Sequence, residues 1–262
     1  MTDEEKTQEL LQERLDTVAE FYEALYHDLK TPMTILFNNV MAMEKIEELP
    51  KVAVTYLEEI KRSSFRMAKL VRDANDRVRL NQGLLMPRYV MADGVALIKN
   101  ICDSAHVLML NKNIRIIFSS PVSSFGMAMD QQMWERIVLN LLANAKDYSF
   151  WGDEIHCSID IKDDVFSVTI RDFGKGVPPE LASSIFARYT GDTGRGLRSG
   201  LGLYIVKELS TLMGGEVQIK SADPGTEVTI NVPVFYTEEQ QEIMIIDDFF
   251  SDNMVQMELS SI

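Results

Sequence analysis

The first of the three histidines in this chain, His27, has neighbours that suit nucleophilic chemistry. Its ring lies about 200° around a helix from Leu25, a member of an apolar seam, so it is expected to face solvent. Asp28 can accept the proton of one ring nitrogen and leave the other nitrogen nucleophilic. Thr31 lies one turn further along the same face, directly before Pro32. The alternative is an ordinary solvated surface histidine.

Two asparagines, Asn140 and Asn144, are four residues apart in a segment with helical periodicity, so they share one helix face. Side-chain amide oxygens are hard ligands of the kind that Mg²⁺ prefers. The spacing favours a magnesium ligand here, with a pair of exposed amides as the alternative.

A predicted strand ends at Asp172 and leads into a turn that contains Gly174 and Gly176. A buried aspartate at a strand end could accept a hydrogen bond from an adenine amino group, and the glycines would let the backbone approach closely. An ordinary strand-exit turn is the alternative.

A glycine-rich stretch, residues 196–202, runs into a predicted helix over 201–213. Free N–H groups and the helix dipole would face an incoming phosphate there. The stretch is neither a Walker loop nor the dinucleotide fingerprint, because their flanking residues are missing. A flexible loop with a glycine-tolerant helix start is the alternative.

The elements that must position these residues fall into two groups. Residues 5–80 read as two helices with heptad seams, joined by a turn at 47–50. Such a hairpin leaves apolar stripes uncovered, so two chains are expected to pair into a four-helix bundle. Pro32 should bend the first helix, and Gly83 should cap the second.

Beyond a linker at 84–89 the pattern becomes mixed helix and strand. Helices are expected over 93–111, 131–147, 179–186 and 201–213, and strands over 114–119, 155–162, 165–172, 216–221 and 226–232. We therefore predict an α+β protein: a helical hairpin domain at 1–83, an α/β-sandwich domain at 84–236 and an acidic tail at 237–262.

Composition limits the classes of partner. The net charge is −14 over 262 residues, which disfavours nucleic acid and anionic membranes as partners. Seven acidic residues and no Lys or Arg fall within 237–262. Two cysteines, no secretory signal and no long apolar run predict a cytoplasmic chain, or the cytoplasmic part of a membrane-anchored sensor.

Taken together, these motifs resemble the catalytic core of sensor histidine kinases. Residues 27–32 resemble the phosphoacceptor box, 135–145 the asparagine box, 171–178 and 196–204 the two glycine boxes, and 185–189 the phenylalanine box of Bergerat-type ATPases. The resemblance covers about residues 10–235. It implies a dimeric four-helix bundle followed by a Bergerat-type ATP-binding domain.

The resemblance implies a kinase that phosphorylates His27 from Mg-ATP and passes the group to an aspartate of a response-regulator receiver domain, and that could also dephosphorylate it. Asp28 would be the general base, and Thr31 would position water. Asn144 would hold Mg²⁺ beside Asn140. The other implied nucleotide contacts are Tyr148, Asp172, Gly174, Gly176, Arg198, Gly200, Leu201 and Gly202. Residues 190–199 would form a lid.

One departure from the family pattern concerns Asp147, which stands where a phosphate-binding Lys or Arg is common, with Lys146 one step away. An acid there would repel the triphosphate unless Lys146 or an arginine in or near the lid (Arg188, Arg195 or Arg198) compensates. The second hypothesis is therefore a phosphatase-biased or catalytically weak scaffold that binds receivers. A Bergerat ATPase of another kind is a third, against which the phosphoacceptor box argues.

Two further features stay open. Cys102 and His106 could form a metal site with His156 and Cys157 if their elements met, although ordinary packing is favoured. Residues 242–248 form an apolar run that ends in two acids and resembles the start of a receiver domain; a disordered acidic tail is the alternative.

Overall fold

The computed structural model describes residues 3–46, 49–177, 201–236 and 259. The chain divides into two compact units, Met1–Met86 and Pro87–Ile262. No described helix combines the length and the apolar character that a bilayer crossing requires.

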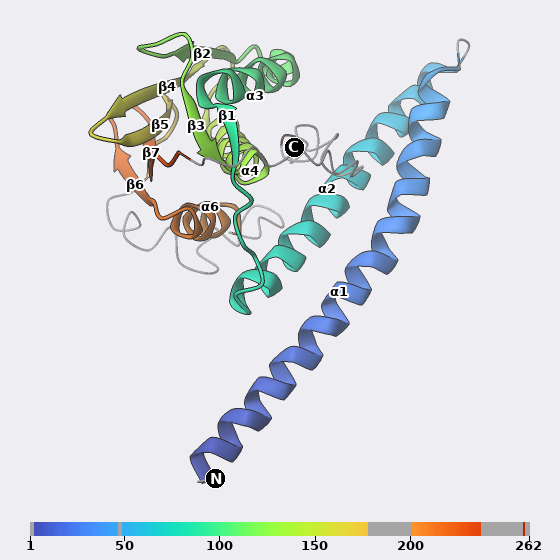
Figure 1. The fold of residues 1–262 in the computed structure, drawn as a ribbon. Coiled ribbons are helices and arrows are strands. Elements are labelled where there is room, and N and C mark those ends of the chain that lie inside the picture. Colours follow the sequence, from blue (N-terminus) through green and yellow to red (C-terminus); the bar gives the residue numbers. More distant parts are fainter. Residues whose placement is uncertain (1–2, 47–48, 178–200, 237–258, 260–262) are drawn as a thin grey trace. The chain divides into compact units, whose positions relative to one another are not determined.

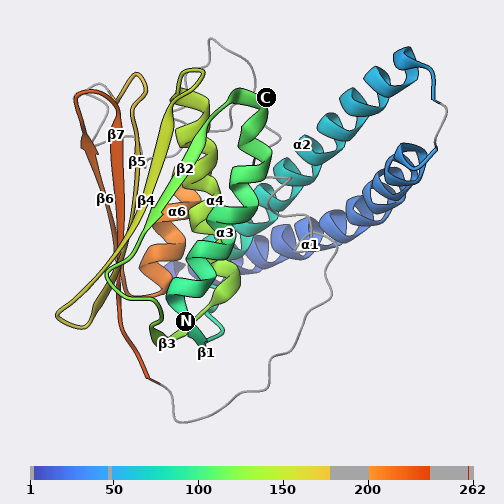
Figure 2. The same ribbon diagram turned by 90° about the horizontal axis from the view of Figure 1, so that it is seen from above.

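The first unit is a helical hairpin of α1 (Asp3–Glu44) and α2 (Lys51–Asn81), which run side by side in both views (Figures 1 and 2). Its buried apolar residues are Phe37, Val40, Leu57, Phe65 and Ala68. The rings of Phe37 and Phe65 meet edge to face, with centroids 4.7 Å apart. Aromatic packing between the two helices therefore stabilises this hairpin.

The predicted seams are only partly covered within one chain. Leu25 and Leu29 on α1 and Ile60 and Met67 on α2 remain exposed. Exposed apolar side chains at regular helical spacing are what a hairpin shows when its stripe is covered by another element.

Gly83 ends α2 as its position predicted. Its φ is +66°, a left-handed conformation that glycine adopts without strain. The Leu84 amide donates to the Arg79 carbonyl at 2.9 Å, and the Gly83 amide donates to the Leu80 carbonyl at 3.1 Å. These bonds satisfy the last carbonyls of the helix.

The second unit is built on a five-stranded sheet with the order β2-β4-β5-β7-β6, in which β2 and β4 are parallel and the other pairs antiparallel. The strands are β2 (Arg115–Ser119), β4 (Glu154–Lys162), β5 (Val165–Asp172), β6 (Glu216–Ser221) and β7 (Thr226–Pro233). The described helices are α3 (Gly94–Met109), the short η1 (Leu110–Lys112), α4 (Gln131–Tyr148) and α6 (Leu201–Leu212).

Figure 2 shows α3, α4 and α6 covering one face of this sheet. No described element of this unit covers the other face, which we call the open face. Along β5 the side chains alternate between buried and half-buried, as the period of a strand requires. The covered face carries the core, where the rings of Trp134 and Phe166 lie 5.6 Å apart and both side chains are fully buried. The predicted two-layer α/β sandwich is thus confirmed.

A second, two-stranded sheet pairs β1 (Val90–Asp93) with β3 (Gly126–Met129) and was not predicted. Strands of four residues contain too little alternation for a periodic signal. Asp93 is a cap rather than a helical residue: its carboxylate accepts hydrogen bonds from Val95 and Ala96, both at 3.0 Å. The predicted helix over 179–186 lies outside the described residues.

Candidate functional site

The histidine motif lies on the surface of α1. His27, Asp28 and Thr31 are all exposed, as the helical phase predicted. The Thr31 hydroxyl reaches the main-chain carbonyl of His27 at 3.5 Å, one turn back. The imidazole of His27 is therefore open to a reaction partner and is not a satisfied core group.

Asp172 ends β5 on the covered face of the sheet, with only 6% of its surface exposed. Its Oδ1 accepts a hydrogen bond from the Gly174 amide at 3.0 Å. Burial raises the pKa of this carboxyl, while hydrogen bonds from the Gly174 and Thr226 amides oppose that rise. The Asp153 carboxylate lies near enough to raise the same pKa further. The end of β5 thus carries a buried hydrogen-bond acceptor, which is the kind of group that could bind the amino group of a base.

Glycines surround this aspartate because no side chain would fit. A Cβ at Gly174 would overlap the Tyr148 carbonyl oxygen, and one at Gly225 would overlap the Asp172 carbonyl oxygen. Gly176 has a φ of +71° and faces Gly225. Gly225 was not among the predicted nucleotide contacts. The sequence signal that could have identified Gly225 is its place in the Asp223–Gly225 turn between two predicted strands.

Asn140 and Asn144 lie on α4, where the structure gives them different surroundings. Asn140 is 2% exposed, and its amide donates to the Arg136 carbonyl at 2.9 Å. The alternative of two exposed amides is therefore wrong for Asn140. The Asn144 Nδ2 atom is buried and has no hydrogen-bond partner among the described residues. Because amide oxygen and nitrogen are assigned from their partners, an orphaned amide on this face fits a site for Mg²⁺ and phosphate.

The second glycine segment meets α4 directly. Gly202 is in the first turn of α6, and a Cβ built on it would lie 2.8 Å from the Asn140 Oδ1 atom. Leu201 is the first residue of α6. Tyr148 ends α4 with its side chain about half exposed. Arg198 and Gly200, together with the lid and the phenylalanine box, lie outside the described residues.

Lys146 does not stand free beside Asp147. It is 4% exposed, and its ammonium donates to the main-chain carbonyl of Leu259, which is itself buried. Compensation of the Asp147 charge by Lys146 would require breaking this bond. The lid arginines, the other source of positive charge considered, are not described.

The two cysteine–histidine pairs are used in packing. The thiols of Cys102 and Cys157 are buried and hydrogen-bonded to each other, which with burial raises the pKa of Cys157. His106 Nδ1 accepts from the Ile116 amide at 3.1 Å, and His156 pairs with Glu154. Within the described ranges no group of three potential ligands could hold a metal ion. The metal-site hypothesis is therefore not supported.

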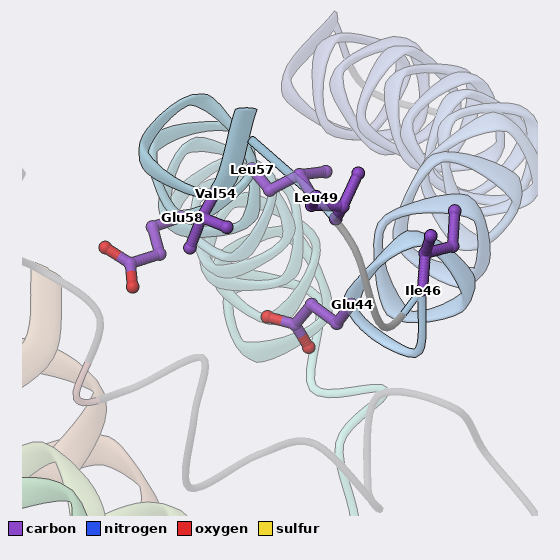
Figure 3. A pocket seen from close by; sticks show the side chains of 6 residues that line it. All are labelled: Glu44, Ile46, Leu49, Val54, Leu57 and Glu58. Carbon is purple, nitrogen blue, oxygen red and sulfur yellow. The ribbon is translucent and has the colours of Figure 1, made fainter. Parts of the chain in front are cut away.

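A pocket in the first unit is distinct from these residues. Figure 3 shows it at the α1–α2 turn, lined by Glu44, Ile46, Leu49, Val54, Leu57 and Glu58. It lies 17 residues along α1 from His27, about 25 Å at 1.5 Å per residue. It is therefore not the phosphoacceptor site.

Two known sequence families match this chain. The family described as "Histidine kinase-, DNA gyrase B-, and HSP90-like ATPase" matches residues 129–235. The family described as "His Kinase A (phospho-acceptor) domain" matches residues 5–83.

Several individual relatives are named as histidine kinases. Sensor histidine kinase YvrG of Bacillus subtilis is 29% identical over 82% of this chain and 38% of its own length. Hybrid signal transduction histidine kinase D of Dictyostelium discoideum is 27% identical over 86% of this chain and 15% of its own length. Histidine protein kinase SaeS of Staphylococcus epidermidis is 31% identical over 82% of this chain and 63% of its own length. The chain thus spans less than two thirds of these relatives.

Solved structures share the fold. The crystal structure of full-length ShkA in complex with AMPPNP matches 85% of this chain and 47% of its own, with a TM-score of 0.68 at 22% identity. The Acinetobacter baumannii histidine kinase AdeS matches 79% of this chain and 97% of its own, with a TM-score of 0.56 at 20% identity.

Proposed function

We propose, given that this chain belongs to the histidine kinase family, that it transfers the γ-phosphoryl group of Mg-ATP to His27 and then to a receiver aspartate of a response regulator. The observation that carries the proposal is the convergence of the two glycine segments on α4. Gly174 packs against Tyr148 at the end of this helix, and Gly202 packs against Asn140 in its middle. This convergence supports nucleotide binding, and the exposed His27 supports the acceptor role.

The binding step follows from the buried carboxylate. Asp172 would accept a hydrogen bond from the adenine amino group with one oxygen, while Oδ1 keeps its bond to the Gly174 amide. The phosphates would lie at the start of α6, where Gly202 lies and where the N–H groups of a helix favour anions. Asn144 would hold Mg²⁺, which neutralises charge on the transferring phosphates.

The transfer step uses the exposed imidazole. One ring nitrogen of His27 would attack the γ-phosphorus as the bond to the bridging oxygen breaks and ADP leaves. Asp28 would take the proton from the other ring nitrogen and so keep the attacking nitrogen nucleophilic. Thr31 would position water when a phosphorylated receiver is dephosphorylated.

Assembly would occur through the hairpin. The exposed apolar residues Leu25, Leu29, Ile60 and Met67 supply the stripe that a second copy would cover in a four-helix bundle. The bundle surface around His27 would then dock the receiver. Because the reaction consumes ATP, we place it in the cytoplasm.

A weak or phosphatase-biased scaffold is the second candidate. It is favoured by Asp147 and by the bond that occupies Lys146. A triphosphate beside an acid whose neighbouring lysine is engaged would bind with reduced affinity.

The test is autophosphorylation with γ-labelled ATP and Mg²⁺, comparing wild type with His27→Gln and with His106→Gln as the matched control. His106 is suited because it lies on α3, outside the phosphoacceptor motif, and its ring accepts a hydrogen bond from the Ile116 amide. We expect acid-labile label in wild type and control and none in His27→Gln. Label that persists in His27→Gln would refute the acceptor role, and ATP binding without any label would favour the scaffold.

A further inference from the structure

A group of side chains on the open face of the sheet lies directly behind Asp172. We call Arg115, Glu154, His156, Arg171 and Phe173 the outer-face cluster. Strand register brings them together, since Arg115 is paired with Glu154 and His156 with Arg171. Because side chains alternate along a strand, Arg171 points outward and Asp172 inward.

The contacts form a chain that ends on Phe173. Arg115 Nη2 donates to Glu154 Oε1 at 2.6 Å, and Glu154 Oε2 lies 3.0 Å from His156 Nε2. The His156 ring meets the Phe173 ring edge to face, with centroids 4.9 Å apart and planes at 72°. The Arg171 guanidinium lies over the same ring, with Cζ 4.9 Å from its centroid.

The hydrogen bonding of Arg171 is consistent with its contact to the Phe173 ring. Its Nε atom is buried and lacks a hydrogen-bond partner in the described part of the chain. A guanidinium over an aromatic face gains attraction from the ring quadrupole. The Phe173 ring is therefore in contact with both Arg171 and His156.

Phe173 links the two residues that shape the nucleotide pocket, because it stands between Asp172 and Gly174. On the opposite side, a Cβ at Gly225 would lie 2.8 Å from the Phe173 Cα atom, so the backbone of the turn is closely packed there. Rotation of the turn would have to move the Phe173 ring out of its contacts. Movement of the turn that carries Asp172 would therefore disturb the contacts of the outer-face cluster.

We propose that His156 is a positioning residue for nucleotide recognition: by holding Phe173 on the open face of the sheet, it fixes the Asp172–Gly174 turn that reads the base. This proposal rests on the proposed function above. His156 itself does not enter the pocket. It is on the far side of the sheet from Asp172 and stays partly exposed. Its effect is on the selection of adenine, not on the transfer step.

The experiment measures the affinity of ATP and of GTP in Mg²⁺ by calorimetry for wild type, His156→Ala and His156→Phe. Edge-to-face aromatic pairs are worth enough to change an equilibrium about three- to tenfold. We expect His156→Ala to weaken ATP binding by about that factor, leave GTP binding nearly unchanged and so lower the preference for ATP. His156→Phe keeps a ring but not the bond to Glu154, and should restore the preference.

Phe173→Leu is the second variant, because it keeps apolar volume and removes the ring. It should lower the preference for ATP as His156→Ala does. Thr169→Val is the matched control on the same face; its hydroxyl pairs with Thr229 at 2.9 Å, away from the turn. In the kinase assay the KM for ATP should rise in His156→Ala while kcat at saturating ATP stays constant.

An unchanged preference for ATP in both His156→Ala and Phe173→Leu would overturn the proposal, as would failure of His156→Phe to restore it. A merely structural role would lower thermal stability without changing the ATP-to-GTP ratio of the folded protein, and that outcome also overturns it. If wild type binds ATP but never labels His27, the proposed function fails while the affinity ratios still decide this inference. If wild type binds no nucleotide, both fail.

Discussion

Gly202 lies so close to Asn140 that a Cβ on the glycine would be 2.8 Å from the asparagine Oδ1 atom. Asn140 cannot turn away easily, because it is buried and its amide donates to the Arg136 carbonyl. The first residues of α6 and the middle of α4 are therefore packed too closely for a side chain larger than that of glycine at position 202.

Gly202→Ala should consequently weaken nucleotide binding. The added methyl group must displace either Asn140 or the start of α6, and overpacking of this kind costs about 1–3 kcal/mol. We expect a loss of ATP affinity in calorimetry together with a lower unfolding temperature. Gly126→Ala is the control, since nothing lies within 4 Å of a Cβ there. Equal ATP affinity in Gly202→Ala and wild type would contradict the close fit.

Gly174→Ala should be more damaging than Gly202→Ala. Its Cβ would overlap the backbone carbonyl of Tyr148, and backbone atoms can move less than the end of a side chain. We expect a destabilisation at or above the upper end of the usual range of about 1–3 kcal/mol, measured by urea unfolding of the second unit. A variant as stable as wild type would show that the β5 exit and the end of α4 are not packed as described.

Asp172→Asn should separate stability from recognition. Burial raises the pKa of Asp172 above its ordinary value of 3.8. At a pH between 3.8 and the raised pKa, the native state therefore holds a proton that the unfolded chain has lost. The contribution of Asp172 to the free energy of unfolding of the wild type is therefore largest below pH 3.8, and it is lost as pH rises through the pKa of the folded state. Asn cannot ionise and can still accept from Gly174.

The stability of Asp172→Asn relative to wild type should thus increase from about pH 4 upward and then level off, in urea unfolding at a series of pH values. The same variant should lose its preference for ATP over GTP. A difference in stability that stays flat across this pH range would mean that the carboxyl is not desolvated.

Phe65→Ala should destabilise the hairpin without affecting the ATP-binding unit. Phe65 is buried against Phe37, and removal of a buried aromatic ring costs about 3–5 kcal/mol. Both tryptophans, Trp134 and Trp151, lie in the second unit, so fluorescence follows that unit alone. We expect a lower transition in circular dichroism, which includes α1 and α2, and an unchanged fluorescence transition. A shift of both would indicate that the units unfold together.

Several features were predictable because they depend on neighbours along the chain. Heptad spacing predicted α1 and α2, helical phase predicted the exposure of His27, and a left-handed glycine was expected at Gly83. Alternating side chains predicted β4 and β5 and placed Asp172 at a strand end. The small β1–β3 sheet was missed because each of its strands is only four residues long.

The sequence by itself thus determined the elements, their order and the chemical types of the site residues, since helical and strand periods are properties of short segments. Only the tertiary structure decided that Gly202 meets Asn140, that Lys146 is engaged by Leu259 and that His156 lies behind Asp172. Those pairings depend on strand register and on how helices dock, and neither leaves a local period along the chain. The same residue types could have formed an ordinary turn, a free lysine and a histidine remote from Asp172 if the strands and helices had packed differently.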